Sequence, residues 1–317
     1  MQLHANRVRA SVRFASLRNH FQGRVVDCVR PLRTNRTAAS AGAGGTAAAM
    51  GGDTKFTYGR TIVKDAQGGH EATVIMLHGL GDTGDGWAAV APQMRLENIK
   101  WIFPTAPTRP ITLNGGMSMP GWFDLRSVDF AIATGRMDSE GIDDSVRYVL
   151  SLAEAEWQAG VPKVVLAGFS QGGHIAAQAA IRAPRPVAGC VSLSSWVGEL
   201  PPSSAVADVP AFIGHGQHDE LVPFACADMS RDAMAKAGFE VTLRSYGMGH
   251  SSCPQELDDL RDWLAEVVAG PEAKPTEAEI AAMPVRELKR RLQRAGVDLR
   301  PLIEKADLVN KAKEVLM

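Results

Sequence analysis

The chain has 317 residues, 45% of them hydrophobic, and its 34 Lys and Arg nearly balance its 35 Asp and Glu. This length and apolar content predict one α/β domain of roughly 200 to 250 residues with extensions. No apolar run approaches the roughly 18 residues that a membrane-spanning helix needs, so we expect no transmembrane segment. Four cysteines without metal-ligand spacing exclude a disulfide scaffold and indicate free thiols in a reduced compartment.

Residues 1–50 carry the strongest charge asymmetry in the chain. They contain eight arginines, no lysine and a single acid, Asp27, and they end in an Ala/Gly tract. This composition is typical of a transit peptide for the mitochondrion or plastid, and it lacks the continuous apolar core of a secretory signal. The alternative is a disordered extension with translation starting at Met50, which predicts a cytoplasmic protein.

Strand and helix patterns alternate along the rest of the chain. We expect strands at 56–63, 72–77, 101–103, 164–167, 188–193, 210–214 and 239–245. We expect helices at 87–95, 142–158, 174–181, 226–237 and 254–268. The stretch 105–135 is irregular and rich in Pro, Gly and Met. Strands separated by helices predict the α/β class, with a mostly parallel central sheet and helices on both faces.

The most specific motif is Gly-Phe-Ser-Gln-Gly-Gly at 168–173, between an apolar strand and a helical pattern. This is the Gly-x-Ser-x-Gly nucleophile elbow in the setting it requires, a strand, a sharp turn and a helix. The glycines let the backbone take a strained turn and let neighbouring chain pack closely, so that the serine hydroxyl is exposed above the sheet. The motif predicts Ser170 as a nucleophile and an α/β-hydrolase fold.

An α/β-hydrolase supplies its remaining triad residues in the order acid, then histidine. Asp219 follows the strand at 210–214, at the carboxyl end of which α/β sheets place their chemistry, and its neighbour Glu220 is the alternative acid. His250 follows the next strand, and a histidine can accept a serine proton and return it near neutral pH. The sequence therefore predicts Ser170, Asp219 and His250 as catalytic residues.

The oxyanion hole of such a site needs two backbone N–H donors. One is the amide after the nucleophile, Gln171, and the other comes from the glycine-rich loop 77–84, where Leu80 is the expected donor. A phosphate-binding loop is the competing interpretation of 77–84, but the loop lacks the Gly-Lys-Ser/Thr ending. We expect no metal and no organic cofactor, because the metal-binding and dinucleotide-binding motifs are missing from the sequence.

The residues that characterise this chain fall into six blocks, whose content and order along the chain both matter: 77–82, 103–107, 119–124, 168–173, 215–223 and 249–253. Together they resemble the acyl-protein thioesterase, lysophospholipase and small carboxylesterase family of α/β-hydrolases. The resemblance implies a hydrolase domain at 56–269 with the triad and oxyanion amides named above. It also implies an acyl channel, lined by Met117, Trp122 and Leu221. For Trp122, a loop packed on the core is the alternative.

The resemblance also implies a reaction and its partners. We expect two-step acyl transfer on an acylated protein or on a lipid or small ester. The sequence shows no inserted helical cap, which favours a shallow, accessible site and leaves room for a transient contact with a membrane surface. Thioester and oxygen ester pass through the same tetrahedral chemistry, so the motifs do not separate them.

A second, smaller unit follows the hydrolase domain. We expect a linker at 270–280 and a helical unit at 281–317. Leu288, Leu292, Gly296 and Asp298, followed by residues 303–309, resemble a SAP-type helix-extended-loop-helix module. Five basic residues fall on its first helix: Arg286, Lys289, Arg290, Arg291 and Arg294. Acidic residues nearly balance them, which favours a solvated helix face and, next, a protein partner over nucleic acid.

Two functions remain open from the sequence. The first is a serine hydrolase that removes fatty acyl groups from proteins, with carboxylesterase and lysophospholipase activity. The alternative is a non-catalytic scaffold whose C-terminal module binds protein or nucleic acid. An intact triad with both oxyanion loops favours the hydrolase, because a decayed scaffold is expected to lose one of these parts.

Overall fold

A computed structural model describes residues 54–127, 137–270, 275–294, 297–300, 302 and 304–316. The chain divides into two compact units, the first ending at Val268 and the second running from Ala269 to Met317. The predicted transit peptide at 1–50 lies outside the described residues.

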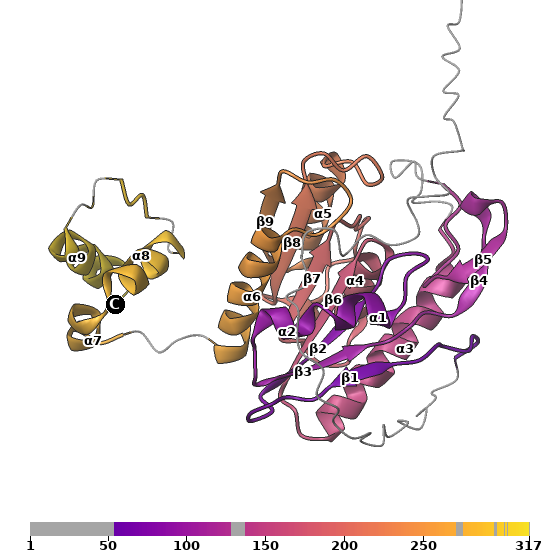
Figure 1. Cartoon of the computed structure of the whole chain (residues 1–317), viewed down its shortest axis with the longest axis horizontal. Helices are drawn as coiled ribbons and strands as arrows, with labels where there is room; N and C mark the ends of the chain where they lie inside the picture. The colour runs from indigo at the N-terminus through magenta and orange to yellow at the C-terminus, as the bar shows by residue number, and fades with distance from the viewer. Residues whose placement is uncertain are drawn as a thin grey trace, which may run out of the picture. The chain divides into compact units, whose positions relative to one another are not determined.

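The first unit is built on a seven-stranded sheet with the order β1-β3-β2-β6-β7-β8-β9 (Figure 1). Its strands are β1 (Ile62–Lys64), β2 (Ala72–Leu77), β3 (Ile99–Phe103), β6 (Lys163–Phe169), β7 (Gly189–Leu193), β8 (Pro210–Gly216) and β9 (Glu240–Tyr246). The edge strand β1 is antiparallel to β3, and every other pair in this sheet is parallel. The mostly parallel sheet predicted from the sequence is therefore confirmed.

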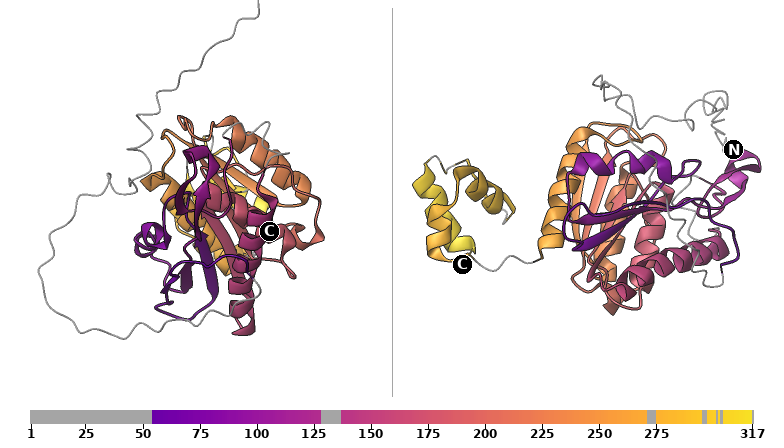
Figure 2. Two further views of the ribbon diagram at one scale, coloured as in Figure 1. Left: turned by 90° about the vertical axis from the view of Figure 1, so that its right-hand side faces the viewer. Right: turned by 60° about the horizontal axis from the view of Figure 1, so that its bottom comes forward.

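Helices cover both faces of the sheet (Figure 2). They are α1 (Gly84–Ala88), α2 (Ala91–Met94), α3 (Ser139–Gln158), α4 (Gln171–Arg182), α5 (Ala225–Ala237) and α6 (Pro254–Ala269), with short 3₁₀ turns η2 (Thr112–Asn114) and η4 (Ser204–Val206). Alternate residues of β6 join opposite cores. Val164 and Leu166 pack with residues of α3, α4 and α5, whereas Val165 and Ala167 pack with residues of α1, α2 and α6. A strand buried on both faces is a continuous apolar run, which is the pattern that predicted it.

The structure differs from the sequence prediction in three places before α3. The helix expected at 87–95 is two short helices, because the chain turns between α1 and α2. Helix α2 then ends at Arg95, which adopts a left-handed conformation. The strand expected at 56–63 is only the short β1. The stretch expected to be irregular contains a hairpin, β4 (Thr108–Ile111) and β5 (Met117–Pro120), which pair in an antiparallel register.

The described residues of the second unit form the helices α7 (Glu277–Ala282), α8 (Val285–Arg294) and α9 (Lys305–Leu316). Five fully buried side chains form its core: Ile280, Leu288, Leu292, Leu308 and Ala312. The sequence predicted α8 and α9 but placed a linker at 270–280, where α7 begins. The start of α7 is set by a capping box, in which the Thr276 hydroxyl and the Glu279 carboxylate each accept the other residue's backbone N–H.

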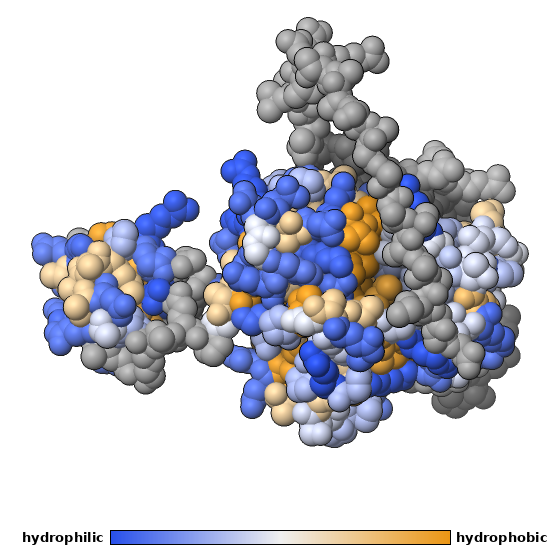
Figure 3. All heavy atoms as spheres, turned by 90° about the horizontal axis from the view of Figure 1, so that it is seen from below, coloured by the Kyte–Doolittle hydropathy of each residue, from blue (hydrophilic) through white to orange (hydrophobic). Residues whose placement is uncertain are grey.

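The described surface carries few large apolar side chains. Figure 3 shows one face, where hydrophilic residues dominate and apolar residues emerge in smaller patches. The exposed large hydrophobic residues are Val63, Met117, Met229, Val285 and Val315. Across the described ranges, no helix combines the length and apolarity needed to cross a bilayer.

A buried carboxyl group of α6 has no hydrogen-bond partner among the described residues. Glu256 lies in the first turn of α6, is fully buried, and neither of its carboxyl oxygens has a hydrogen-bond partner among the described residues. A Cβ atom added at Gly214 of β8 would collide with this carboxyl group. Burial, with a smaller effect of the Asp259 charge, raises the pKa of Glu256 to about 8. The folded chain therefore holds this side chain protonated at neutral pH.

We expect Glu256→Gln to flatten the pH dependence of stability. Because the pKa of Glu256 is about 8 in the folded chain and near 4.5 when unfolded, its contribution is fully present below pH 4.5 and is lost as the pH rises to about 8. The difference is on the order of a few kcal/mol. Urea unfolding of both proteins at pH 5, 6.5 and 8 measures it.

The matched control is Asp258→Asn in the same helix, since the Asp258 side chain is exposed and forms an ion pair with Arg261. We expect this variant to keep the wild-type pH slope. Equal slopes for wild type and Glu256→Gln would contradict a protonated Glu256.

Candidate active site

Ser170 occupies the sharp turn between β6 and α4. Its φ of 52° and ψ of −120° lie outside the regions that non-glycine residues normally adopt. Two hydrogen bonds connect this turn to the end of β7 and the residues after it. The Ser170 N–H donates to the Leu193 carbonyl of β7 at 2.8 Å, and the Ser195 hydroxyl donates to the Ser170 carbonyl at 2.6 Å. Strain of this kind persists only where the surroundings enforce it. In this turn the Ser170 side chain is half-exposed.

Close packing explains the glycines of the elbow. A Cβ atom at Gly172 would lie 2.5 Å from the Leu77 carbonyl oxygen of β2, and one at Gly168 would collide with the Gly172 backbone. Backbone atoms cannot move aside as a flexible side chain can. The turn therefore brings the start of α4 against the end of β2, where the glycine-rich loop begins.

The structure brings His250 and Asp219 to Ser170. His250 Nε2 lies 3.0 Å from Ser170 Oγ, and His250 Nδ1 lies 2.7 Å from Asp219 Oδ2. The other carboxylate oxygen of Asp219 accepts the backbone N–H groups of Leu221 at 2.9 Å and Val222 at 2.8 Å. With Nδ1–H donating to the carboxylate, Nε2 is free to accept the serine proton.

The loop after β8 selects Asp219 over its neighbour. The Asp219 side chain is fully buried and bonded to His250, whereas Glu220 is exposed. His215 lies beneath this loop, where its Nε2 donates to the Val222 carbonyl at 2.8 Å. Burial lowers the pKa of His215, so this imidazole is neutral and supports the acid loop.

The two predicted oxyanion donors lie just after the ends of two neighbouring strands, β2 and β6. Leu80 follows β2, and Gln171 is the first residue of α4. In the part of the chain that the structure describes, neither of their N–H groups donates to a backbone carbonyl. Two amides left free beside a serine nucleophile are suited to bind a developing oxyanion.

His78 holds the loop that carries Leu80. It is fully buried, its Nδ1 lies 2.6 Å from the Gly79 carbonyl, and its Nε2 accepts the Ala106 N–H at 3.0 Å. Only a neutral ring with the proton on Nδ1 satisfies both contacts. Burial lowers the pKa of His78 in the same sense. The sequence showed this histidine directly after a buried strand but gave no sign of its two partners.

The three residues expected to line an acyl channel are placed differently. Met117 begins β5 and is 60% exposed, and Leu221 beside the acid is half-buried. Trp122 is completely buried, and its indole N–H donates to the His78 carbonyl at 2.8 Å. The channel role predicted for Trp122 is therefore corrected, because a side chain without exposed surface has nothing to offer an acyl chain. The alternative of a loop packed on the core holds.

Among the described residues, no group of three or more His, Cys, Asp or Glu side chains is arranged to hold a metal ion. The cysteines described are free thiols, with Cys190 and Cys226 buried and Cys253 half-buried. Burial raises the pKa of Cys226 to about 11. The reacting groups that the described site offers are thus the serine, the imidazole and the carboxylate.

Comparison with known proteins agrees with this geometry. The phospholipase/carboxylesterase family model matches residues 59–268. Acyl-protein thioesterase 1 of Cryptococcus neoformans is 40% identical over 222 residues, which cover 63% of this chain and 93% of that protein. The Neurospora crassa acyl-protein thioesterase 1 is 40% identical over 213 residues, covering 62% of this chain and 87% of that protein.

A solved structure shows the same fold. The crystal structure of Zea mays acyl-protein thioesterase 2 aligns with a TM-score of 0.59 at 32% identity, covering 67% of this chain and all of that chain. The non-catalytic scaffold considered from the sequence is not favoured by these matches. The chain is a serine hydrolase acting on acyl esters, and it belongs to the phospholipase/carboxylesterase family of α/β-hydrolases.

Proposed function

We propose that this chain is an acyl-protein thioesterase, which removes fatty acyl groups from protein thioesters. One observation carries the proposal: Ser170, His250 and Asp219 are hydrogen-bonded in series. Ser170 Oγ lies 3.0 Å from His250 Nε2, and His250 Nδ1 lies 2.7 Å from Asp219 Oδ2. The relatives named as acyl-protein thioesterases supply the substrate class. Carboxylesterase and lysophospholipase activities follow from the same chemistry on oxygen esters.

The first step acylates the serine. His250 Nε2 takes the Ser170 proton while the hydroxyl attacks the acyl carbonyl, and the Asp219 carboxylate stabilises the imidazolium that forms. The Leu80 and Gln171 amides bind the oxyanion of the tetrahedral intermediate. The sulfur then leaves and takes the proton from His250, so that a thiol departs and the imidazole is neutral again; a thiolate needs this proton less than an alkoxide does.

The second step frees the serine. Water enters as the thiol departs. His250 takes a proton from this water while the water oxygen attacks the acyl-enzyme carbonyl. A second tetrahedral intermediate collapses, the fatty acid leaves, and His250 returns its proton to Ser170. Among the protein's own groups, only Ser170 and His250 change their protonation state, while Asp219 stays ionised and the two amides donate hydrogen bonds.

The substrate approaches an open site. Ser170 is partly exposed and the His250 side chain is 16% exposed, which suits an acyl chain attached to a large carrier such as a protein or a lipid at a membrane surface. Met117 and Leu221 supply apolar surface for the chain, and Met is adaptable enough to accept acyl groups of different shape.

The two ends of the chain carry separate roles in this proposal. The arginine-rich segment 1–50 directs the protein to a mitochondrion or plastid. The C-terminal unit binds a protein rather than nucleic acid, because several of its cations pair with its own acids. Arg291 pairs with Glu287 at 2.8 Å and Lys311 with Glu314 at 2.9 Å, and Lys313 also contacts Glu277.

Asp219→Asn is expected to lower kcat on the order of 10³- to 10⁴-fold. The amide no longer stabilises the imidazolium and favours the wrong imidazole tautomer, and the equivalent change in the well-studied serine protease triad costs about 10⁴-fold. Steady-state hydrolysis of a p-nitrophenyl ester measures the loss. Glu220→Gln is the matched control, since Glu220 is adjacent but exposed, and we expect it to keep kcat within about 2-fold. A comparable loss of kcat in both variants would contradict Asp219 as the acid of the triad.

Labelling with a fluorophosphonate probe tests the nucleophile, and paired substrates test the leaving group. The full chain should label stoichiometrically and Ser170→Ala should not label, because the probe reacts with an activated serine. Two peptides of one sequence, palmitoylated on either Cys or Ser, then compare thioester with oxygen ester. We expect kcat/KM to favour the thioester by at least about 10-fold, or about 1.4 kcal/mol.

The outcomes separate the levels of the proposal. Labelling with equal or faster turnover of the oxygen ester would keep the serine hydrolase but replace the thioesterase by a carboxylesterase. A full chain that fails to label would contradict the assigned nucleophile.

A further inference from the structure

The segment 120–123 lies between the two loops that carry the expected oxyanion donors. On one side it bonds to the loop after β2: the Gly81 N–H donates to the Pro120 carbonyl at 2.8 Å, and the Trp122 indole N–H donates to the His78 carbonyl at 2.8 Å. These two bonds flank Leu80 in sequence. The amide of Leu80 is therefore fixed from both sides by one stretch of chain, which we call the oxyanion bridge.

On its other side the oxyanion bridge bonds to Gln171. The Gln171 side-chain oxygen accepts the Trp122 backbone N–H at 2.8 Å, and its side-chain nitrogen donates to the Phe123 carbonyl at 2.8 Å. The side-chain amide thus pairs with the bridge through a donor and an acceptor, as a neighbouring strand would. Gln171 is also the residue whose backbone N–H is the second expected donor. The bridge consequently contacts both halves of the oxyanion hole.

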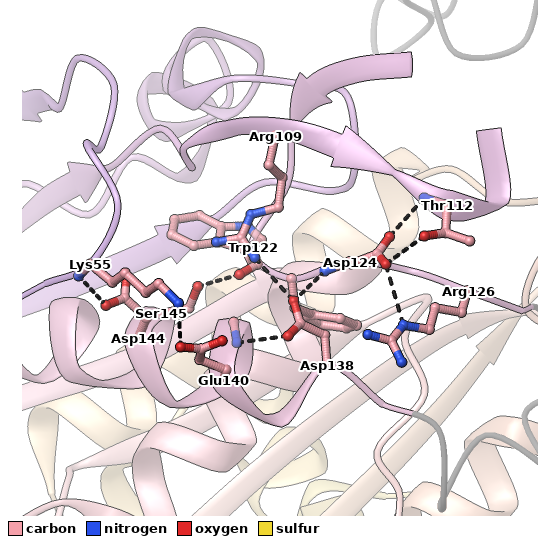
Figure 4. A network of polar contacts seen from close by, with 12 residues as sticks. Lys55, Arg109, Thr112, Trp122, Asp124, Arg126, Asp138, Glu140, Asp144 and Ser145 are labelled. Carbon is pink, nitrogen blue, oxygen red and sulfur yellow. Dashed lines mark hydrogen bonds and ion pairs between the residues drawn. The ribbon is translucent and has the colours of Figure 1, made fainter. Parts of the chain in front are cut away.

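Helix α3 holds the bridge in place. The Ser145 hydroxyl donates to the Trp122 carbonyl, and the Asp138 carboxylate accepts the Asp124 N–H at 2.9 Å (Figure 4). Asp138 also caps α3 through the Gly141 N–H at 3.0 Å. The bridge is therefore anchored to the first turns of a 20-residue helix.

Burial makes these contacts stiff. Trp122, His78 and Ser145 are fully buried, and Gln171 is 7% exposed. A buried polar group that loses its partner costs about 1–3 kcal/mol, so each contact resists displacement. Space is equally limited, since a Cβ atom at Gly121 would lie 3.0 Å from Leu80 Cδ1 and 3.6 Å from the Gln171 side-chain oxygen.

We infer that the oxyanion bridge sets the spacing between the Leu80 and Gln171 amides, with Trp122 and the Gln171 side chain as positioning residues. The inference rests on the proposed function, because it takes these amides as the oxyanion hole. An oxyanion donor acts only where it points at the developing charge, and losing one costs about 10²- to 10³-fold in rate. A misplacement of about 1 Å can cost about 10²-fold.

Two substitutions break the bridge without removing either donor. Trp122→Phe keeps a buried ring but loses the N–H that bonds to His78, and Gln171→Met keeps the side-chain length and the backbone amide but loses both bonds to the bridge. We expect kcat for a p-nitrophenyl ester to fall roughly 10- to 100-fold while KM stays within about 3-fold. A trifluoromethyl ketone forms a tetrahedral adduct with the serine. Its Ki should rise by the same factor by which kcat/KM falls.

Each variant has a matched control. Trp157→Phe changes a buried tryptophan whose indole N–H has no partner among the described residues. Gln178→Met changes a buried glutamine of the same helix, α4, whose side-chain oxygen binds Arg182. We expect both controls to keep wild-type kcat and Ki. Titrating active sites with the fluorophosphonate probe expresses every rate per folded, reactive serine.

The results decide between distinct conclusions. A selective fall in kcat that the ketone Ki follows, in either bridge variant, supports the positioning role. Bridge variants with kcat within 2-fold of wild type, or with losses equal to those of their controls, would overturn it while the hydrolase assignment stands. If Trp122→Phe fails to fold, Gln171→Met decides alone. A wild-type chain that neither labels nor turns over ester would overturn the proposed function and this inference with it.

Discussion

The strained backbone at Ser170 is the constraint on which the rest of the site depends. A φ of 52° at a non-glycine residue is maintained by the Leu193 carbonyl and the Ser195 hydroxyl, both on the side of β7. The same turn presses Gly172 against the end of β2 on the other side. Because β6 stands between β2 and β7, one turn fixes the nucleophile relative to the glycine-rich loop. The positions of the two expected oxyanion donors thus depend on strand order as much as on loop sequence.

Much of this architecture could be predicted because its signals are local. The buried strands are continuous apolar runs, and the elbow, the acid loop and the histidine loop each carry their chemistry within a few residues. The hairpin β4–β5 could not be predicted, because prolines at 110 and 120 argue against strands and are tolerated only in a two-stranded edge. The burial of Trp122 was equally hidden, since its partners His78 and Gln171 lie 44 and 49 residues away in sequence.

Buried polar side chains give this site its geometry. His78 is neutral and uses both ring nitrogens on backbone groups, and Gln171 uses both atoms of its amide in the same way. Burying such groups is costly unless each finds a partner, so a complete set of partners favours one arrangement over its alternatives. Glu256 shows the contrast. It is buried without a hydrogen-bond partner among the described residues, and burial raises its pKa to about 8.

The polar anchor of the oxyanion bridge extends to the surface that an acyl chain would meet. Asp124, directly after the bridge, accepts the Thr112 N–H at 2.7 Å and the Thr112 hydroxyl at 2.6 Å, while its own N–H bonds to Asp138. Thr112 begins the turn between β4 and β5, the hairpin that carries Met117. The hairpin and the bridge therefore share one anchor on α3. Donors held this way before substrate arrives need no rearrangement during the reaction, which is the condition under which fixed dipoles stabilise a transition state best.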